Sequence, residues 1–308
     1  MNDLTPHFEH ACALAAVACQ PWVGQGDKEA ADAAAVEAMR ERFAETPMAG
    51  RIVIGEGERD EAPMLFIGEE VGAGGPAIDI AVDPLEGTTL CAENRPGALC
   101  VAAFAPRGGL LHAPDVYMQK IAVGPGFDLD ADDLDRPLGE VLNRLKAQAE
   151  ETLQVVMLDR PRHAEIASAV EASGADLHLI PEGDVMGVLQ TCLAGPNGRS
   201  PFQVYLGSGG APEGVLAAAG LQSLGGSMVG RLLFRDEAEI ARAEAVGVTD
   251  LNRVYSLEDL ATPAARLVLA GVTPQVLAGV EDRGVEGQRV EILTITPDFG
   301  PARRFITA

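Results

Sequence analysis

The chain has 308 residues, enough for one large or two medium domains with a sizeable core. Its 46 acidic and 23 basic residues give a formal net charge of −23, which argues against nucleic acid and against an anionic membrane as partners. The five cysteines form no C-x-x-C pair, and no apolar stretch is long enough to span a bilayer. We therefore expect a soluble cytoplasmic protein with reduced thiols.

Apolar spacing predicts alternating helices and strands in the first half of the chain. Asp27 stands in front of a helical pattern, in the position of an N-cap. A turn-rich, acidic stretch over 124–135 marks the predicted boundary between an N-terminal metal-binding α/β domain, 1–136, and a C-terminal α/β substrate domain, 137–308. The elements expected before this boundary are helices at 5–19, 27–46 and 61–71, strands at 51–54 and 77–83, and apolar segments at 98–105 and 116–123.

The second half has the rhythm of a parallel α/β sheet, which places ligand sites in the loops at the ends of its strands. Beyond 235 the pattern is rich in helices and turns and closes with a strand at 289–295. The elements expected between these points are helices at 138–150, 164–173, 185–193 and 212–224, and strands at 153–159, 177–180 and 202–206.

Two carboxylates close the apolar run 77–82, in the sequence Asp83-Pro84-Leu85-Glu86-Gly87-Thr88. If Pro84 begins a tight turn and Gly87 lets the backbone close, Asp83 and Glu86 reach the same point. Carboxylates gathered without a nearby cation repel one another, and a hard divalent cation relieves that repulsion. An ordinary surface turn is the alternative, because Asp-Pro and Gly-Thr are common turn dipeptides.

A second acidic loop follows the strand at 51–54, with Glu56, Glu58 and Asp60 between glycines. Its spacing lacks the third glycine of the dinucleotide-binding fingerprint, so a metal loop is the better interpretation. Asp32 lies in an otherwise small and apolar helical stretch, where most acids are simply solvated.

Two further loops in the second half have the chemistry of phosphate and metal sites. The glycine-rich run 207–214 joins a strand to a helix, and Glu213 lies in the first turn, where an acid commonly only stabilises the helix dipole. Arg160-Pro161-Arg162 follows the strand at 153–159 and can hold a phosphate bidentately, although surface arginines are common.

Together these segments resemble the class II fructose-1,6-bisphosphatases, collinearly from about residue 14 to residue 234. The Asp-Pro-x-Asp/Glu-Gly-Thr turn is shared by the wider lithium-sensitive phosphatase superfamily, whereas the Gly-Glu-Gly-Glu and Gly-Gly-Ala-Pro-Glu-Gly motifs are typical of the class II branch. The matching segments include 26–32, 52–65, 79–88, 113–118, 123–126, 160–163, 180–185 and 209–216.

The resemblance implies a layered α/β/α/β/α sandwich and a metal-dependent hydrolase that cleaves the 1-phosphate of fructose 1,6-bisphosphate in gluconeogenesis or the Calvin cycle. It implies two or more Mn²⁺ or Mg²⁺ ions per site and a homodimer or homotetramer. Asp32 and Glu56 would bind one metal, and Asp83, Glu86 and Glu213 another. Two divalent ions would nearly neutralise these five carboxylates, which explains how an acidic protein can accept an anionic substrate.

The same resemblance assigns the substrate and the catalytic groups. Thr88 would orient the attacking water, with Glu58 and Asp60 as proton acceptors or further metal ligands. Arg162 would clamp the phosphate that is not cleaved. The residues expected to contact the sugar bisphosphate are Glu86, Gly87, Thr88, Tyr117, Arg160, Pro161, Arg162, Glu182, Gly183, Asp184 and Gly210.

Departures from the family pattern leave substrate choice open. Thr89 follows Thr88 where relatives carry another residue such as arginine, and Glu182-Gly183-Asp184 replaces Asp-Gly-Asp. Sedoheptulose 1,7-bisphosphate is therefore a second candidate substrate. An inositol-monophosphate-like phosphatase and a catalytically inactive sugar-phosphate sensor are the competing hypotheses; the class II motifs disfavour the first, and the complete set of carboxylates disfavours the second.

Overall fold

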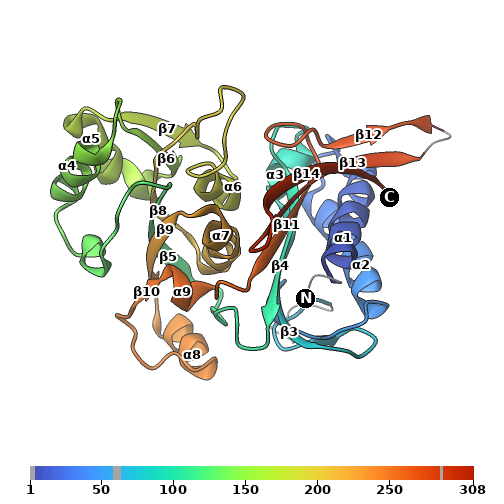
Figure 1. The fold of residues 1–308 in the computed structure, drawn as a ribbon. Helices are drawn as coiled ribbons and strands as arrows, with labels where there is room; N and C mark the ends of the chain where they lie inside the picture. Colours follow the sequence, from blue (N-terminus) through green and yellow to red (C-terminus); the bar gives the residue numbers. More distant parts are fainter. Residues whose placement is uncertain (1–3, 58–63, 285–286) are drawn as a thin grey trace. The chain divides into compact units, whose positions relative to one another are not determined.

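A computed structural model describes residues 4–57, 64–284 and 287–308. The chain forms two compact units, Met1–Leu111 with Ala264–Ala308, and His112–Pro263 (Figure 1). This division differs from the predicted boundary near 136. The segment 117–123 hydrogen-bonds to two strands of the second unit, and the strands after 264 return to the sheet of the first. Among the described residues, no helix is both long and apolar enough to cross a bilayer.

The first unit is a mixed sheet with helices α1 and α2 packed against it (Figure 1). The strand order is β12-β13-β11-β4-β3-β1-β2, with β14 paired to β13; β1 and β3 are parallel, and the other neighbours are antiparallel. Its elements are α1 (Thr5–Ala18), η2 (Gln20–Trp22), α2 (Lys28–Ala44), β1 (Ala49–Ile54), β2 (Glu70–Val71), β3 (Ala77–Glu86), α3 (Thr88–Ala92), β4 (Leu99–Pro106), β11 (Arg266–Gly271), β12 (Val280–Asp282), β13 (Gln288–Thr296) and β14 (Gly300–Thr307).

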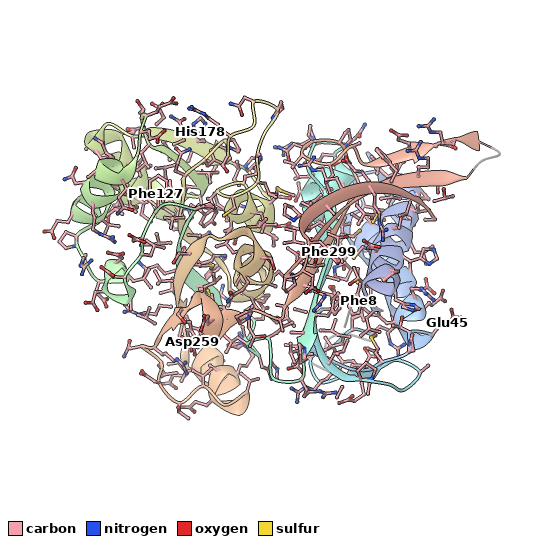
Figure 2. All side chains as sticks on the ribbon, viewed as in Figure 1. Phe8, Glu45, Phe127, His178, Asp259 and Phe299 are labelled. Carbon is pink, nitrogen blue, oxygen red and sulfur yellow. The ribbon has the colours of Figure 1, made fainter. Side chains whose placement is uncertain are left out.

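Aromatic contacts join α1 to this sheet and to α2. Phe8 on α1 stacks on Phe104 of β4 with ring centroids 4.0 Å apart, and it also contacts Phe43 of α2 (Figure 2). Asp27 caps α2 as predicted, because its Oδ1 accepts from the backbone N–H of Ala30 at 3.0 Å. Phe299, by contrast, is 81% exposed beside the turn that joins β13 to β14 (Figure 2).

The helix predicted at 61–71 is wrong over its described part, 64–71. Leu65 and Gly68 both have positive φ, which an α-helix excludes. The backbone pairs with β1: the N–H of Gly68 donates to Ile52 O at 2.8 Å, and Glu70 and Val71 then form β2 against β1.

The second unit is a mixed sheet in the order β10-β9-β5-β8-β6-β7. Only the pairs β6–β7 and β6–β8 are parallel among its described strands, so the parallel sheet predicted here is confirmed for that part alone. Its elements are β5 (Tyr117–Val123), η3 (Ala131–Leu134), α4 (Leu138–Gln148), β6 (Gln154–Leu158), η4 (Pro161–His163), α5 (Ala164–Ser173), β7 (Asp176–Ile180), α6 (Asp184–Leu189), β8 (Val204–Gly210), α7 (Ala211–Leu224), β9 (Ser227–Leu233), α8 (Glu237–Ala245), β10 (Val254–Ser256) and α9 (Leu257–Leu260).

The two faces of the second sheet differ in chemistry. Figure 1 shows α4 and α5 on one face, and α6 and α7 on the other. Ile121 and Val123 join the apolar core beneath α4. Because side chains alternate along a strand, Lys120 points to the opposite face, where it meets the first residue of α6. The buried ion pair of Lys120 and Asp184 therefore lies on the face covered by α6 and α7.

The region after 266 is made mainly of strands, so the helix- and turn-rich pattern predicted beyond 235 holds only as far as α9. The predicted strand at 289–295 is confirmed as β13, which pairs with β11, β12 and β14. Two mixed sheets with flanking helices confirm the α/β sandwich class.

Candidate active site

The end of β3 places two predicted ligands on one face of the first sheet. Asp83 pairs with Val101 and Glu86 with Leu99, so three steps along β3 match two along β4. This bulge replaces the tight turn expected at Pro84. Since Val101 and Leu99 are two residues apart, the register brings Asp83 and Glu86 to the same face. Glu86 is buried and Asp83 is half-buried.

Gly87 ends this strand in the left-handed conformation, with φ of 82°, and starts the short helix α3. Thr88 is the first residue of that helix and is half-buried. Lys28, at the start of α2, donates to Oγ1 of Thr89 at 2.8 Å. The threonine at the departure from the family pattern thus anchors the first turn of α2 to α3.

Asp32 on α2 and Glu56, just after β1, share a hydrogen bond between their carboxyl groups. Burial raises the pKa of Glu56 and the charge of Asp32 raises it further; burial also raises the pKa of Asp32. Two buried carboxyl groups this close together have the donor chemistry of a hard-metal site. The predicted first ligand pair therefore lies together.

The full ligand sets stay predictions. In the described part of the chain, no three acidic, histidine or cysteine side chains are grouped closely enough to hold a metal ion. Glu58 and Asp60 lie outside the described residues. Glu213 belongs to the second unit, whereas Asp83 and Glu86 belong to the first.

Glu213 folds back over the end of β8. It lies in the first turn of α7, and its Oε2 is buried with no hydrogen-bond partner among the described residues. A Cβ at Gly210 would lie 1.8 Å from that oxygen, so the glycine makes room for the carboxylate. Burial raises the pKa of Glu213 and the charge of Asp184 adds to the effect, while Lys120 opposes it. A buried, unpaired carboxylate oxygen fits a metal ligand better than a group that only stabilises the helix dipole.

Asp184 is held by two buried partners that the sequence did not predict. Lys120 Nζ donates to its Oδ2 at 2.5 Å and to Gly210 O at 3.1 Å, and Tyr205 Oη donates to its Oδ1 at 2.5 Å. Lys120 is 1% exposed, which is rare for a lysine without an acidic partner. Each oxygen of Asp184 keeps a second lone pair for a sugar hydroxyl, so its predicted substrate contact stays open.

Arg162 is fixed on β8 by neutral acceptors. Its Nε donates to Ser208 Oγ at 3.0 Å and its Nη2 to Ser208 O at 2.6 Å. The guanidinium also stacks against Tyr117, with Cζ 4.7 Å from the ring centroid. His163 holds Ser208 in turn, since Nδ1 bonds Leu158 O and Nε2 accepts from the N–H of Ser208 at 2.9 Å.

The other predicted substrate residues of the second unit lie beside this arrangement. Arg160 donates to Pro181 O at 2.7 Å, which ties the arginine loop to the Glu182-Gly183 loop. Gly183 has φ of +96° and serves as the N-cap of α6. The structure therefore gathers most of the predicted residues of this unit at the ends of β5, β6, β7 and β8.

Sequence reasoning missed the roles of Lys120, Tyr205, Ser208 and His163. The sequence did contain a signal for Lys120, since it is one of only three lysines and stands inside an apolar run. The other three act where β8 meets the first residue of α6 and the loop after β6, which are distant from β8 in the chain.

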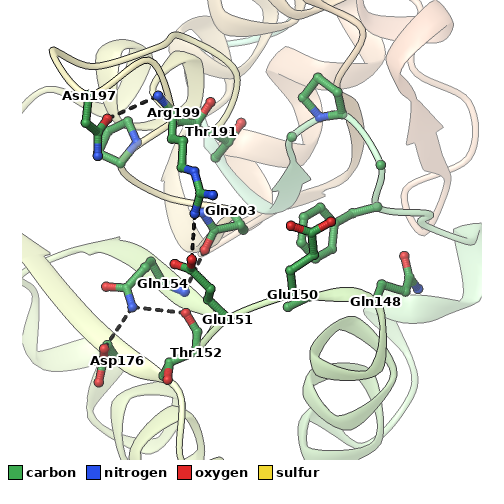
Figure 3. Close-up of a pocket in the computed structure, with 17 residues that line it drawn as sticks. Gln148, Glu150, Glu151, Thr152, Gln154, Asp176, Thr191, Asn197, Arg199 and Gln203 are labelled. Carbon is green, nitrogen blue, oxygen red and sulfur yellow. Dashed lines mark hydrogen bonds and ion pairs between the residues drawn. The ribbon is translucent and has the colours of Figure 1, made fainter.

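A separate polar cavity of about 850 Å³ opens where α4 ends and β6 begins (Figure 3). Two of its acidic groups have partners on the wall: Arg199 donates to Glu151 at 2.6 Å, and Gln154 donates to Asp176 at 2.8 Å. None of the predicted site residues that the structure describes lines this cavity, so we treat it as separate from the candidate active site.

The chain has an α/β fold with acidic side chains at strand ends and, in the second unit, guanidinium groups at the end of β8, a combination that suits an enzyme acting on phosphate esters. The pattern of the family described as bacterial fructose-1,6-bisphosphatase, glpX-encoded, matches residues 2–308. Relatives named D-fructose 1,6-bisphosphatase class 2/sedoheptulose 1,7-bisphosphatase include one from Synechococcus elongatus, 41% identical over 94% of this chain and 91% of its own length. Another, from Prochlorococcus marinus, is 43% identical over 83% of this chain and 80% of its own length.

The chain therefore belongs to the class II family of bacterial fructose-1,6-bisphosphatases. It is a phosphoric monoester hydrolase of carbohydrate metabolism, as the motifs predicted.

Proposed function

We propose that this enzyme cleaves the 1-phosphate of fructose 1,6-bisphosphate, and also of sedoheptulose 1,7-bisphosphate, with release of inorganic phosphate. The observation that carries the proposal is the end of β8, where Ser208 holds the Arg162 guanidinium and Gly210 makes room for the Glu213 carboxylate. A phosphate-binding cation from the loop after β6 and a metal-type carboxylate from α7 thus meet the end of one strand, at Ser208 and Gly210. The names of the relatives support the second substrate.

Two or more divalent ions, Mn²⁺ or Mg²⁺, complete the proposed site. Asp32 and Glu56 hold one, and Asp83, Glu86 and Glu213 hold another. Two observations support this fit: the shared hydrogen bond of Asp32 and Glu56, and the buried Oε2 of Glu213 without a partner among the described residues. When bound, such ions lower the pKa of a coordinated water and neutralise charge on the phosphate.

The chain's own groups do the positioning. The Thr88 hydroxyl, at the first residue of α3, orients the attacking water, and Glu58 or Asp60 accepts its proton. The guanidinium of Arg162 holds the distal phosphate. Its donors are already aligned by Ser208, so little side-chain freedom remains to be lost on binding. This preorganisation supplies the orientation that a slow phosphate-ester hydrolysis requires.

The sugar lies, in this proposal, against the remaining predicted contacts. Gly210, Gly183 and the carboxylate of Asp184 are already linked through Lys120 and the α6 N-terminus. Lone pairs left on Asp184 accept sugar hydroxyls. The other contacts proposed are Glu86, Gly87, Thr88, Tyr117, Arg160, Pro161 and Glu182.

One assay tests the activity. We expect phosphate release from both bisphosphates with Mn²⁺ or Mg²⁺, loss of this release with chelator, and little release from inositol monophosphate. Equal rates on inositol monophosphate would favour the inositol-phosphatase hypothesis. Binding of bisphosphate without turnover under any metal would favour the sensor.

We propose the cytoplasm as the compartment, because all five cysteines are unpaired thiols. A homodimer or homotetramer is the proposed assembly, which sedimentation analysis at micromolar concentration can test.

A further inference from the structure

A second arginine reaches the ring of Tyr117. Arg235 follows β9, and its Cζ lies 5.2 Å from the centroid of the Tyr117 ring; the corresponding distance for Arg162 is 4.7 Å. The Arg235 position was not singled out by the sequence motifs. Two guanidinium groups therefore gather on one aromatic ring in a protein of net charge −23.

Strand pairing explains why both arginines meet there. Tyr117 is the first residue of β5 and pairs with Gly210 on one side and with Leu233 on the other. Arg162 comes from the β8 side, where Ser208 anchors it, and Arg235 comes from the β9 side, two residues after Leu233. The ring is thus a shared platform between the two strands.

The two guanidinium groups are held in different ways. Arg235 donates through Nε to Glu239 Oε1 at 2.5 Å, and its Nη2 forms an ion pair with the same carboxylate. Glu239 is 1% exposed and is fixed by its place in the first turn of α8, whereas the Arg235 side chain is 63% exposed. The aromatic ring and the glutamate aim an accessible guanidinium, as an anion-binding group requires.

Arg235 shares the Glu239 carboxylate with a second arginine, and Asp236 is another acid close enough to act on Arg235. Arg242 also lies within 3.8 Å of the Glu239 carboxylate, so two arginines share this one acid. Arg162 engages only neutral acceptors on Ser208. Like charges on one ring repel each other, and a dianionic phosphate next to both would turn that repulsion into attraction.

We propose that Arg235 is a second anchor for the phosphate that is not cleaved, and that with Arg162 and Tyr117 it forms a two-armed clamp. This inference rests on the proposed function, in which Arg162 holds that phosphate. Arg235 is then a specificity-determining residue for bisphosphates over monophosphates that lack the distal group.

Equilibrium binding without metal tests the clamp apart from catalysis. In the presence of chelator, calorimetry measures the affinities of fructose 1,6-bisphosphate, fructose 6-phosphate and fructose 1-phosphate. Arg235→Gln should weaken the first two by about tenfold and leave fructose 1-phosphate unchanged, because it lacks the distal phosphate. Arg235→Lys should recover part of the loss.

Arg231→Gln is the matched control, because Arg231 lies on β9 and forms an ion pair with Asp135. It should bind all three ligands as the wild type does. Unchanged fructose 6-phosphate binding in Arg235→Gln would overturn the second anchor, and so would an equal loss for all three ligands, which would indicate a structural role. If the wild type binds none of the three ligands without metal, a clamp that acts apart from the metal ions is overturned, whereas the proposed function is decided by the turnover assay with metal.

Discussion

The carboxylate of Glu213 occupies the space that a side chain at Gly210 would fill, since a Cβ there would lie 1.8 Å from Oε2. The backbone at Gly210 has φ of −60° and ψ of 143°, which any residue adopts. The glycine is therefore needed for the position of Glu213, not for the conformation of the chain. The absence of a side chain at position 210 is therefore a requirement of the site and not of folding.

Gly210→Ala should remove most activity while leaving stability nearly unchanged. The new methyl group pushes the flexible end of Glu213 aside, and a displacement of about 1 Å in a catalytic group can cost about 100-fold in rate. Activity and thermal unfolding of the variant, measured together, check this. Gly139→Ala is the control, because a Cβ at Gly139 meets no atom within 4 Å. A full loss of folded protein in Gly210→Ala would contradict the prediction.

Glu213→Gln should be inactive and, without metal, at least as stable as the wild type. The charge of a buried carboxylate whose Oε2 has no hydrogen-bond partner among the described residues opposes folding, and a neutral amide of the same shape lowers that cost by roughly 1 kcal/mol. Mn²⁺ should raise the melting temperature of the wild type and not that of the variant.

Glu140→Gln is the matched control for this change, because Glu140 lies in the first turn of α4 and is exposed. It should keep both activity and the metal-dependent rise in melting temperature. Asp83→Ala should likewise abolish turnover. Full activity of Glu213→Gln or Asp83→Ala, or wild-type activity undiminished by chelator, would rule out the two-metal assignment.

Elements whose position is set by a local sequence signal were predicted correctly from that signal. Asp27 marks the start of α2, and the apolar run at 77–82 marks β3. The helix predicted over 64–71 is wrong because backbone hydrogen bonds to β1, such as that from Gly68 to Ile52, outweigh the helical spacing of its apolar residues. The compact units divide after Leu111 and after Pro263, and not at the acidic stretch, since strand pairing links β5 to β8 across the chain.

The residues of the candidate site also divide into those predicted from motifs and those identified only by the tertiary structure. Asp32 and Glu56 were predicted from motifs, and the structure brings them into contact. The partners of Asp184 were not predictable, because Lys120 and Tyr205 reach it from separate strands. Such contacts follow from tertiary packing that no short motif encodes.

Lys120→Met should strongly destabilise the second unit. The change leaves Asp184 buried without its cation and removes the positive charge beside Glu213. Breaking a buried ion pair on one side costs about 3–5 kcal/mol. Urea unfolding checks this, and the double variant Lys120→Met/Asp184→Asn should recover part of the loss. A single variant as stable as the wild type would mean that water reaches the pair and solvates Asp184.

Stability should depend on pH through His163. Burial lowers the pKa of this imidazole, against the opposing bond to Leu158 O, so the folded state favours the neutral ring. The contribution of His163 to the free energy of unfolding is present above the ordinary histidine pKa of about 6.5. It is lost as the pH falls through the lower pKa of the folded state.

Urea unfolding of the wild type and of His163→Asn at several pH values tests the effect. The stability of the wild type should fall more steeply below about pH 6.5 than that of the variant, since only the wild type must protonate this ring. His7 and His10 also have lowered pKa values, but they are common to both proteins and cancel in the difference. Parallel curves would show that His163 does not contribute.

Arg162→Ala should act on substrate binding more than on chemistry. An arginine–phosphate pair in a partly buried site contributes about 2–4 kcal/mol, so kcat/KM for the bisphosphate should fall roughly 30- to 1,000-fold, mainly through KM. Metal affinity without substrate should barely change, and Arg162→Lys should recover part of the loss because an ammonium lacks the planar fork.

Arg199→Ala, which removes an exposed arginine of the same unit, should leave the kinetics unchanged. Monoesters without a distal phosphate should be nearly indifferent to Arg162→Ala, because the group it holds is absent. The guanidinium is aligned by Ser208 before substrate arrives, so Ser208→Ala should reproduce part of the KM effect without removing the charge. If Arg162→Ala lowers kcat/KM equally for monoesters and bisphosphates, then Arg162 acts at the reacting phosphate or in folding, and the clamp assignment is wrong.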